Sequence, residues 1–374
     1  MKLLYVESSL AIHGGIERVL TDKLNWLVED GNCEVCLITV NQGGNPLVFP
    51  LSPKVQCHDL GIMFHQVYRY KGWRRYRLMF QLHKSFRQRL KERIQIFMPD
   101  AIVCTRLELV PDVMKVKDDI PVAYEAHNSY MDFHNFRCSQ RFQIKFFYHV
   151  LRKVNLIVAL TQGDALEWKK INPHVHVIPN VVHLNDTDRY SDCSSKSAIF
   201  VGRYTYQKDI PSLLEIWELV CQQYPDWQLH IFGGYGGQKE HLQSVIKQHG
   251  ATIVIHQPTP SINEEYLKCS MLLVTSRYEP FGLVIPEAMS CGLPVVAFSC
   301  PYGPATIITD CVDGFVIKER NVKYYASKVC QLIADQNLRH KMGQAGIKSS
   351  QRYNANNIMP EWKKLFSELI YTYE

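Results

Sequence analysis

The sequence predicts an α/β protein built from two Rossmann-like, doubly wound domains. Short apolar segments alternate with amphipathic ones along the chain, a pattern that favours βαβ units and parallel sheets. The alternation starts afresh near residue 198, after a polar stretch at 185–197 that is rich in Ser and Asp. A length of 374 residues is enough for two domains of ordinary size.

The first predicted domain covers residues 1–184. Gly14 and Gly15 follow the first apolar segment, and the amphipathic run at 16–28 after them predicts the first helix. The strands of this domain are expected at 3–6, 35–40, 101–104, 122–124, 156–160 and 175–178. Because helices separate these strands, we expect a parallel sheet with helices on both faces.

The second predicted domain covers residues 198–356, and 185–197 is the predicted linker. Its strands are expected at 198–201, 228–232, 252–255, 271–274 and 295–298. In the closing segment of the chain, apolar residues recur at helical spacing, which predicts one more helix at 357–374.

Composition narrows the class of protein. The chain is 46% hydrophobic, and no apolar run reaches the ~18 residues that span a bilayer. The first nine residues are interrupted by Glu7, so we expect a first strand there rather than a signal peptide, and a cytoplasmic protein. Among the 12 cysteines only Cys33 and Cys36 form a C-x-x-C pair, which indicates reduced core thiols and no zinc site.

The stretch at 275–298 carries the strongest functional pattern. The apolar segment at 271–274 predicts a buried strand, Glu279 lies in the turn after it, and Glu287 follows eight residues later near a helix start. Ligands of parallel α/β sheets bind at the carboxyl ends of strands, and a helix start suits a phosphate. Taken alone, two glutamates near a helix start are more often solvent residues that complement the helix dipole.

The residues from Glu279 to Val284 (EPFGLV) and the following Pro286-Glu287-Ala-Met resemble the E-x7-E signature of retaining GT-B glycosyltransferases. More narrowly, they are similar to glycosyltransferase family 4, the large group 1 family of bacterial polysaccharide and glycolipid enzymes. Val201-Gly202-Arg203, with Lys208 five residues on, is a second match. The resemblance implies two domains that face each other across a cleft, with the last helix packed back on the first domain.

The resemblance also implies roles for individual residues. Arg203 and Lys208 would stabilise the negative charge on the β-phosphate of the leaving nucleotide. Glu279 would hold the donor sugar and Glu287 the ribose hydroxyls, while His127 would position the substrate. The implied catalytic residues are Arg203, Lys208, Glu279 and His127, and the implied donor-binding residues are Gly14, Gly15, Gly202, Gly234, His256, Phe281, Gly282, Leu283, Val284 and Glu287.

The segment at 68–97 is strongly basic, with ten Lys or Arg residues and Glu92 as its one acid. Aromatic residues are interleaved, and a helical stripe of apolar residues predicts that part of the segment packs on the first domain. Three interpretations are open: a solvated basic face, an interfacial helix on an anionic membrane, or a nucleic-acid surface without a recognition motif. We expect weak, salt-sensitive membrane association and no nucleic-acid partner.

The expected function is transfer of a sugar, with retained configuration, from a nucleotide-sugar donor, a UDP-sugar in our interpretation. The acceptor is expected to be a lipid-linked or surface-polysaccharide oligosaccharide. Neither a cofactor nor a metal is expected, and the enzyme is placed in the cytoplasm, peripherally on the inner face of the membrane. Two alternatives remain, a sugar-nucleotide epimerase and a non-catalytic nucleotide-sugar-binding subunit. Gln257 in place of the family's usual glycine leaves the base contacts near His256 open.

Overall fold

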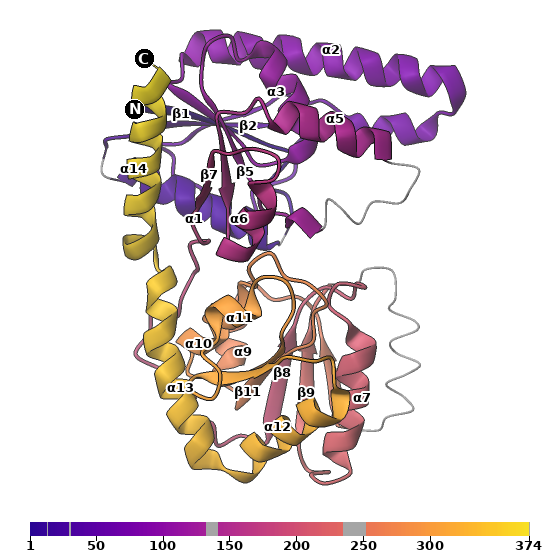
Figure 1. Cartoon of the computed structure of the whole chain (residues 1–374), viewed down its shortest axis with the longest axis vertical. Helices are drawn as coiled ribbons and strands as arrows, with labels where there is room; N and C mark the ends of the chain where they lie inside the picture. The colour runs from indigo at the N-terminus through magenta and orange to yellow at the C-terminus, as the bar shows by residue number, and fades with distance from the viewer. Residues whose placement is uncertain (13, 30, 132–140, 235–251, 374) are drawn as a thin grey trace. The chain divides into compact units, whose positions relative to one another are not determined.

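The computed structural model describes residues 1–12, 14–29, 31–131, 141–234 and 252–373. These residues form two compact units (Figure 1). Unit 1 comprises residues 1–181 and 355–374, and unit 2 comprises residues 182–354.

Unit 1 is built on a seven-stranded parallel sheet with the order β3-β2-β1-β4-β5-β6-β7. Its strands are β1 (Lys2–Glu7), β2 (Glu34–Thr39), β3 (Gln56–Asp59), β4 (Ala101–Cys104), β5 (Val122–Glu125), β6 (Leu156–Ala159) and β7 (Val175–Val177). Its helices are α1 (Gly15–Glu29), α2 (Gly72–Phe97), α3 (Val110–Val116), α5 (Arg141–Leu151), α6 (Gln162–Trp168) and α14 (Ala355–Tyr373), with short 3-10 turns η1 (Phe64–Arg69) and η2 (Leu107–Leu109).

Both faces of this sheet are buried, as the apolar runs predict. Because successive side chains of a strand point to opposite faces, Leu4 and Val6 join the core under α2, α3, α5 and α6, whereas Leu3 and Tyr5 join the core under α1 and α14. In the second core, Tyr5 meets Phe366 of α14 edge to face at 6.5 Å. The chain's last helix is therefore part of unit 1.

Unit 2 repeats the plan with a six-stranded parallel sheet of order β10-β9-β8-β11-β12-β13. Its strands are β8 (Ser197–Val201), β9 (Gln228–Phe232), β10 (Ile253–His256), β11 (Met271–Val274), β12 (Val295–Phe298) and β13 (Gly314–Ile317). Its helices are α7 (Ile210–Cys221), α9 (Ile262–Tyr266), α10 (Val284–Ser290), α11 (Pro304–Ile307), α12 (Val322–Ala334) and α13 (Gln336–Ser350), followed by the 3-10 turn η4 (Gln351–Tyr353).

The predicted fold class, two parallel doubly wound sheets, is confirmed. In each unit the strand order runs outward in both directions from the first strand, so the order reverses between β1 and β4 and again between β8 and β11. Ligands of such sheets bind at this switch point, outside the carboxyl ends of the strands. The short strands β3 and β13 were not predicted from the sequence.

The polar segment at 185–197 differs from its description as a linker, because it lies within unit 2. The hydroxyl of Ser191 donates to the carbonyl of Cys269 at 2.6 Å, and the amide of Asn185 donates to Ser290 of α10 at 2.9 Å. Short polar side chains that bond backbone groups keep such a segment packed in spite of its composition.

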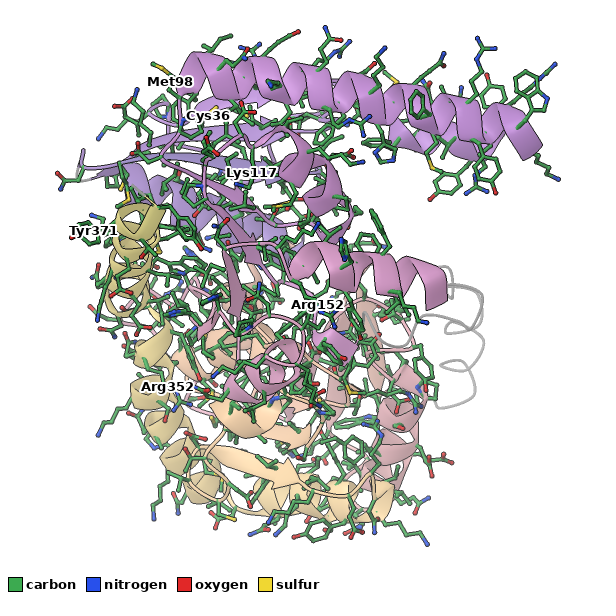
Figure 2. All side chains as sticks on the ribbon, turned by 45° about the horizontal axis from the view of Figure 1, so that its top comes forward. Cys36, Met98, Lys117, Arg152, Arg352 and Tyr371 are labelled. Atoms are coloured by element: carbon green, nitrogen blue, oxygen red, sulfur yellow. The ribbon has the colours of Figure 1, made fainter. Side chains whose placement is uncertain are left out.

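Helix α2 and the 3-10 turn before it form two dissimilar parts. Residues 82–97, which we call the α2 root, bury Phe86, Leu90, Ile94 and Phe97 in the core of unit 1. Residues 63–81, which we call the α2 tip, include η1 and run out past the sheet (Figure 1). Figure 2 shows side chains of the projecting part standing away from the rest of the unit, whereas Met98 marks the end of the helix that lies over the sheet.

Candidate active site

The switch point of unit 2 lies between the loops that follow β8 and β9 on one side and β11 on the other. Two glycines let the ends of β8 and β9 come close: a Cβ on Gly233 would lie 2.0 Å from the carbonyl oxygen of Gly202. The Lys208 side chain lies over Gly202, where a Cβ would be 3.2 Å from Lys208 Cδ. Gly202 and Lys208, which were both predicted as site residues, are therefore packed against each other, because the glycine leaves room for the lysine side chain.

Lys208 forms an ion pair with Glu279, which lies in the loop after β11. Ser276 donates its hydroxyl to the same carboxylate oxygen, Glu279 Oε1, at 2.6 Å. Lys208 and Glu279 are only 15% and 6% exposed at their side chains, so the pair is largely sheltered from water. Two predicted catalytic residues, 71 positions apart in the sequence, are thus in direct contact.

The backbone of Glu279 is held by the loop after β12. Glu279 donates its amide to the carbonyl of Pro301 at 2.8 Å, and the amides of Tyr302 and Gly303 donate to the Glu279 carbonyl at 3.0 and 2.9 Å. A Cβ on Gly303 would lie 1.8 Å from the carbonyl oxygen of Phe281, so only glycine permits this approach. Gly282 has a φ of +98°, a conformation that likewise favours glycine.

The segment from Phe281 to Val284 leads into α10. None of the four backbone N–H groups of Phe281, Gly282, Leu283 and Val284 donates to a residue that the structure describes. Helix α10 is only seven residues long, so any anion affinity here comes from these local amides rather than from a long helix dipole. Glu287, in the first turn of α10, accepts a hydrogen bond at 3.4 Å from Tyr266 of α9.

Arg203, the other predicted cation, is exposed at the end of β8. No ion pair or hydrogen bond joins its side chain to any described residue. No described residue therefore compensates the charge of its guanidinium, which lies five positions before Lys208 in the sequence.

An ionic cluster around Asp209 was not foreseen. The buried Asp209 carboxylate binds Arg277 at 2.7 Å and also Arg320. Arg320 donates to the carbonyls of Thr275 and Ser276, both at 2.9 Å. Asp209 itself has a positive φ of 50°. The cluster joins the loop that carries Lys208 to the loop that carries Glu279.

Gly234 and His256 lie at the carboxyl ends of β9 and β10, on the same edge of the sheet. The amide of Tyr204 donates to the Gly234 carbonyl at 3.3 Å. The His256 ring stacks on Phe232 with the centroids 4.2 Å apart, and burial lowers the pKa of this imidazole. The rest of the predicted glycine turn, 235–237, lies outside the described residues.

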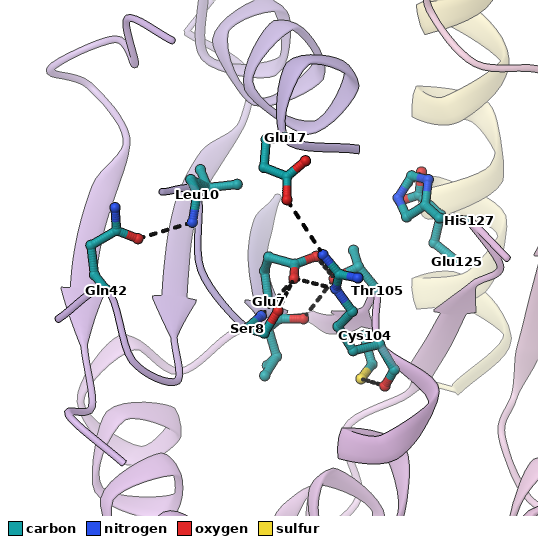
Figure 3. A network of polar contacts seen from close by, with 11 residues as sticks. Glu7, Ser8, Leu10, Glu17, Gln42, Cys104, Thr105, Glu125 and His127 are labelled. Carbon is teal, nitrogen blue, oxygen red and sulfur yellow. Dashed lines mark hydrogen bonds and ion pairs between the residues drawn. The ribbon is translucent and has the colours of Figure 1, made fainter. Parts of the chain in front are cut away.

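The switch point of unit 1 holds a buried network (Figure 3). Glu7 ends β1 and binds Arg106, which follows β4, and it accepts hydrogen bonds at 2.7 Å from the hydroxyls of Ser8 and Thr105. Burial alone would raise the pKa of Glu7, but Arg106 and the two hydroxyls outweigh it and hold the pKa below its usual value. Arg106 also reaches Glu17 of α1, at 3.7 Å.

Gly14 and Gly15 lead into α1 above this network. A Cβ on Gly14 would lie 2.2 Å from a carboxylate oxygen of Glu17, so the glycine makes room for a side chain that turns back over the helix start. The predicted phosphate approach at these glycines therefore meets a carboxylate already in place. Gly15 is exposed.

His127 lies beside a second buried ion pair of unit 1, Lys23 with Glu125. Lys23 also lies 3.6 Å from the ring centroid of Trp362 in α14. His127 Nε2 is 3.3 Å from Glu125 Oε1, but neither His127 Nε2 nor Glu125 Oε2 has a hydrogen-bond partner. Burial lowers the pKa of His127, which favours the neutral imidazole. Buried polar atoms normally have hydrogen-bond partners, so these two atoms are exceptions within the described residues.

The described residues show neither a metal-binding cluster nor a membrane-spanning helix. No group of three or more His, Cys, Asp or Glu side chains among them is arranged to hold a metal ion. Within the same residues, no helix combines the length and apolar character needed to cross a bilayer.

The fold is similar to that of solved glycosyltransferase structures. TarM from S. aureus, in complex with fondaparinux, α-GlcNAc-glycerol and UDP, matches with a TM-score of 0.78 and 16% identity over 98% of this chain and 99% of TarM. HepE from Anabaena, in complex with UDP and glucose, matches with a TM-score of 0.74 and 18% identity over 98% of this chain and 99% of HepE. At these identities the likeness concerns the fold.

The sequence families decide the assignment. The family model described as Glycosyltransferase Family 4 matches residues 13–186, and the model described as Glycosyl transferases group 1 matches residues 191–349. The chain belongs to the GT-B glycosyltransferases of the family 4 type. Among curated relatives of this glycosyltransferase, the amylovoran biosynthesis glycosyltransferase AmsD of Erwinia amylovora is 28% identical over 98% of this chain and 99% of AmsD. The protein is thus a glycosyltransferase of the polysaccharide-biosynthesis type.

Proposed function

We propose that this glycosyltransferase transfers a sugar, with retained anomeric configuration, from a UDP-sugar to a lipid-linked or surface-polysaccharide oligosaccharide. The names of its relatives support the two substrates: TarM and HepE were solved with UDP, and AmsD is named for biosynthesis of the polysaccharide amylovoran. The observation that carries the proposal is the sheltered Lys208–Glu279 pair at the switch point of unit 2.

The reaction breaks the bond between the anomeric carbon and the β-phosphate oxygen, and that oxygen keeps the electron pair. Lys208 and Arg203 would stabilise the charge that develops there, an effect worth several kcal/mol when donors are fixed in advance. Glu279 holds Lys208 through Oε1, and no hydrogen bond joins its Oε2 to a described residue, which suits a hydroxyl of the donor sugar. The acceptor oxygen then bonds to the anomeric carbon on the face that the phosphate leaves, and its proton passes to a phosphate oxygen.

The remaining donor contacts follow from the same edge of the sheet. The free amides from Phe281 to Val284 suit phosphate oxygens, because backbone N–H groups gathered in one loop form an anion site. Glu287 suits the ribose hydroxyls, since a carboxylate accepts two hydrogen bonds from adjacent hydroxyls. Gly202, Gly234 and His256 would line the nucleotide.

Unit 1 is assigned to the acceptor side and to positioning of the transferred sugar. His127 Nε2 and Glu125 Oε2 are buried and have no hydrogen-bond partner among the described residues, so they suit a substrate hydroxyl, which both donates and accepts. Gly14 and Gly15 would let a substrate approach the backbone. We propose no metal or cofactor, because Arg203 and Lys208 supply the positive charge; activity unchanged by EDTA would support this, and activity restored only by Mg²⁺ or Mn²⁺ would refute it.

The partner of the basic segment at 68–97 is proposed to be an anionic membrane surface, which places the enzyme peripherally on the cytoplasmic face. A lipid-linked acceptor supports this proposal, because such an acceptor is available only at a membrane.

The two alternative functions make different predictions for one experiment. The protein is incubated with a panel of UDP- and GDP-sugars, with and without a glycan acceptor, and released nucleoside diphosphate and recovered sugar are measured. A transferase releases UDP in an acceptor-dependent way. An epimerase consumes the UDP-sugar without an acceptor, and a binding subunit shifts its thermal midpoint without turnover.

A further inference from the structure

The α2 root and the α2 tip differ in whether acidic residues pair with their basic side chains. In the root, Arg87 binds Asp112 of α3 at 3.0 Å, and Lys91 lies 3.4 Å from Asp118. His83 also binds Asp112, at 2.5 Å. The root is thus anchored by buried apolar residues and by acidic partners on the neighbouring helix.

The α2 tip has no such partners. Its five basic residues all lie on the surface, and no carboxylate of a described residue pairs with them: Arg69, Lys71, Arg74, Arg75 and Arg77. No acidic residue occurs in the sequence between Asp59 and Glu92. Neither the tip's own sequence nor any described carboxylate therefore compensates its positive charge.

Large aromatic side chains are exposed among these charges. Tyr68, Trp73, Tyr76 and Phe80 are 77%, 65%, 69% and 66% exposed, and Tyr70 is also on the surface. Arg75 lies over the Tyr68 ring at 5.5 Å, and Arg74 over Trp73 at 5.7 Å. Contiguous exposed aromatic residues indicate an interaction site rather than a solvated face.

The start of α2 is also unfavourable as an isolated structure. The N-cap residue Lys71 makes no side-chain cap hydrogen bond, and the first turn holds no acidic residue. Cations at this end of a helix oppose its dipole, whereas an external anion would complement both. These features favour contact between the tip and a negatively charged partner.

We propose that the α2 tip docks this glycosyltransferase on an anionic lipid bilayer, with its aromatic side chains in the headgroup layer. Tyr and Trp favour this interface because one end of each ring is apolar and the other polar, and basic residues are attracted to anionic headgroups. The purpose of this docking rests on the proposed function, in which the acceptor is lipid-linked. The evidence for the docking comes from the tip alone. It narrows the membrane contact from the whole basic segment to residues 63–81.

Sedimentation of the full-length protein with vesicles tests the docking. Vesicles of phosphatidylcholine with 30% phosphatidylglycerol should bind the protein, with binding that weakens as NaCl rises, because salt screens exposed charges. Arg74→Glu, Arg75→Glu and Arg77→Glu together should lower partitioning at least about a hundredfold, since each charge contributes several-fold. The matched control reverses Arg152, Lys153 and Lys169, three exposed basic residues of unit 1 outside α2. This control changes the net charge equally and should retain most of the binding.

Aromatic insertion has its own readout. Vesicles should shift tryptophan emission to the blue in the wild type, and Trp73→Phe should abolish that shift. Trp73→Ala with Tyr76→Ala should weaken partitioning about tenfold, whereas Tyr371→Ala with Tyr373→Ala, exposed in α14, should leave it unchanged.

Three results would overturn the proposal. These are equal binding to pure phosphatidylcholine, equal loss in the matched control, and retention by a DNA duplex with no binding to vesicles, which would favour the nucleic-acid interpretation. Transfer to a water-soluble acceptor without vesicles should be unaffected by all tip variants. Failure of docking is therefore distinguishable from failure of the proposed reaction.

Discussion

The two sheets carry polar groups at the same topological position but use them differently. At the switch point of unit 1, Arg106 is bound by Glu7 and lies near Glu17, so its charge is fully compensated. At the switch point of unit 2, Lys208 is bound by Glu279, but Arg203 and the amides that precede α10 have no partner among the described residues.

This difference supports the roles that we propose for the two units. A diphosphate leaving group requires uncompensated donors, and these are found on unit 2. Unit 1 instead offers carboxylates and a neutral imidazole, which suit the hydroxyls of a sugar or an acceptor. We therefore propose that the repeated plan provides an anion site on the sheet of unit 2 and a hydroxyl site on the sheet of unit 1.

The largest expected effect comes from removing the cations of unit 2. Lys208→Ala should lower kcat about a thousandfold and Arg203→Ala about a hundredfold, because a pre-placed charge aimed at the leaving group is worth a few kcal/mol. Donor affinity should fall much less. Lys196→Ala, which removes only a surface pair with Asp226, is the control and should leave kcat unchanged. Equal losses in kcat and donor affinity would indicate uniform binding instead.

A smaller effect is expected at Asp209, a positioning residue for Lys208. Asp209→Gly should lower kcat about thirtyfold, since the loop that carries Lys208 is no longer held by Arg277 and Arg320. Glycine accepts the positive φ at this position, so the substitution adds no backbone strain, and the expected loss of stability comes from the broken ion pairs alone. Donor Kd should change little. A rise in donor Kd and a loss of stability without a fall in kcat would remove Asp209 from this role.

Glu287 should affect donor affinity more than turnover. Glu287→Gln should weaken UDP binding about tenfold by calorimetry, as expected when a carboxylate loses its charge in hydrogen bonds to hydroxyls. The control compares the binding of UDP with that of its 2′,3′-dideoxy analogue, which lacks both ribose hydroxyls. The analogue should bind wild type and variant equally, and a variant that discriminates as strongly as the wild type would contradict the ribose assignment.

The smallest expected effect is on the stability of the fold and comes from Glu7 in unit 1. Glu7→Gln should lower the free energy of unfolding by about 1 kcal/mol at pH 7, because the ionised carboxylate is the better partner for Arg106. Since the pKa of Glu7 is lowered in the folded protein, this stability is present above the unfolded pKa of ~4.3 and is lost as pH falls through the lower folded pKa. Denaturation curves of the two proteins should therefore converge in acid, and a constant difference would contradict the ionic role.

Local sequence patterns accounted for the residues that lie near one another along the chain. Apolar runs predicted most strands, and the short spacings of Gly202 to Lys208 and of Glu279 to Glu287 marked the site on unit 2. The strand β3 was missed because its sequence, QCHD, is polar and mostly exposed at the edge of the sheet.

Long-range ionic partners had no local signal. Arg320 and Asp209 are 111 residues apart, and Arg106 and Glu7 are 99 apart, so no spacing relates them. One topological signal was available: Glu7 and Arg106 each come at the end of an apolar strand, and those two strands are neighbours in the Rossmann order. The exposure of the α2 tip could not be predicted either, since apolar spacing runs through the whole helix and only the root finds a surface to cover.

Proton NMR of a reaction containing the protein, a UDP-sugar and a glycan acceptor tests retaining transfer most directly. We predict a new anomeric signal whose coupling constant belongs to the same anomer as the donor, appearing at the rate at which UDP is released. A product of the opposite anomer, or conversion of the donor into an epimeric UDP-sugar without an acceptor, would contradict it.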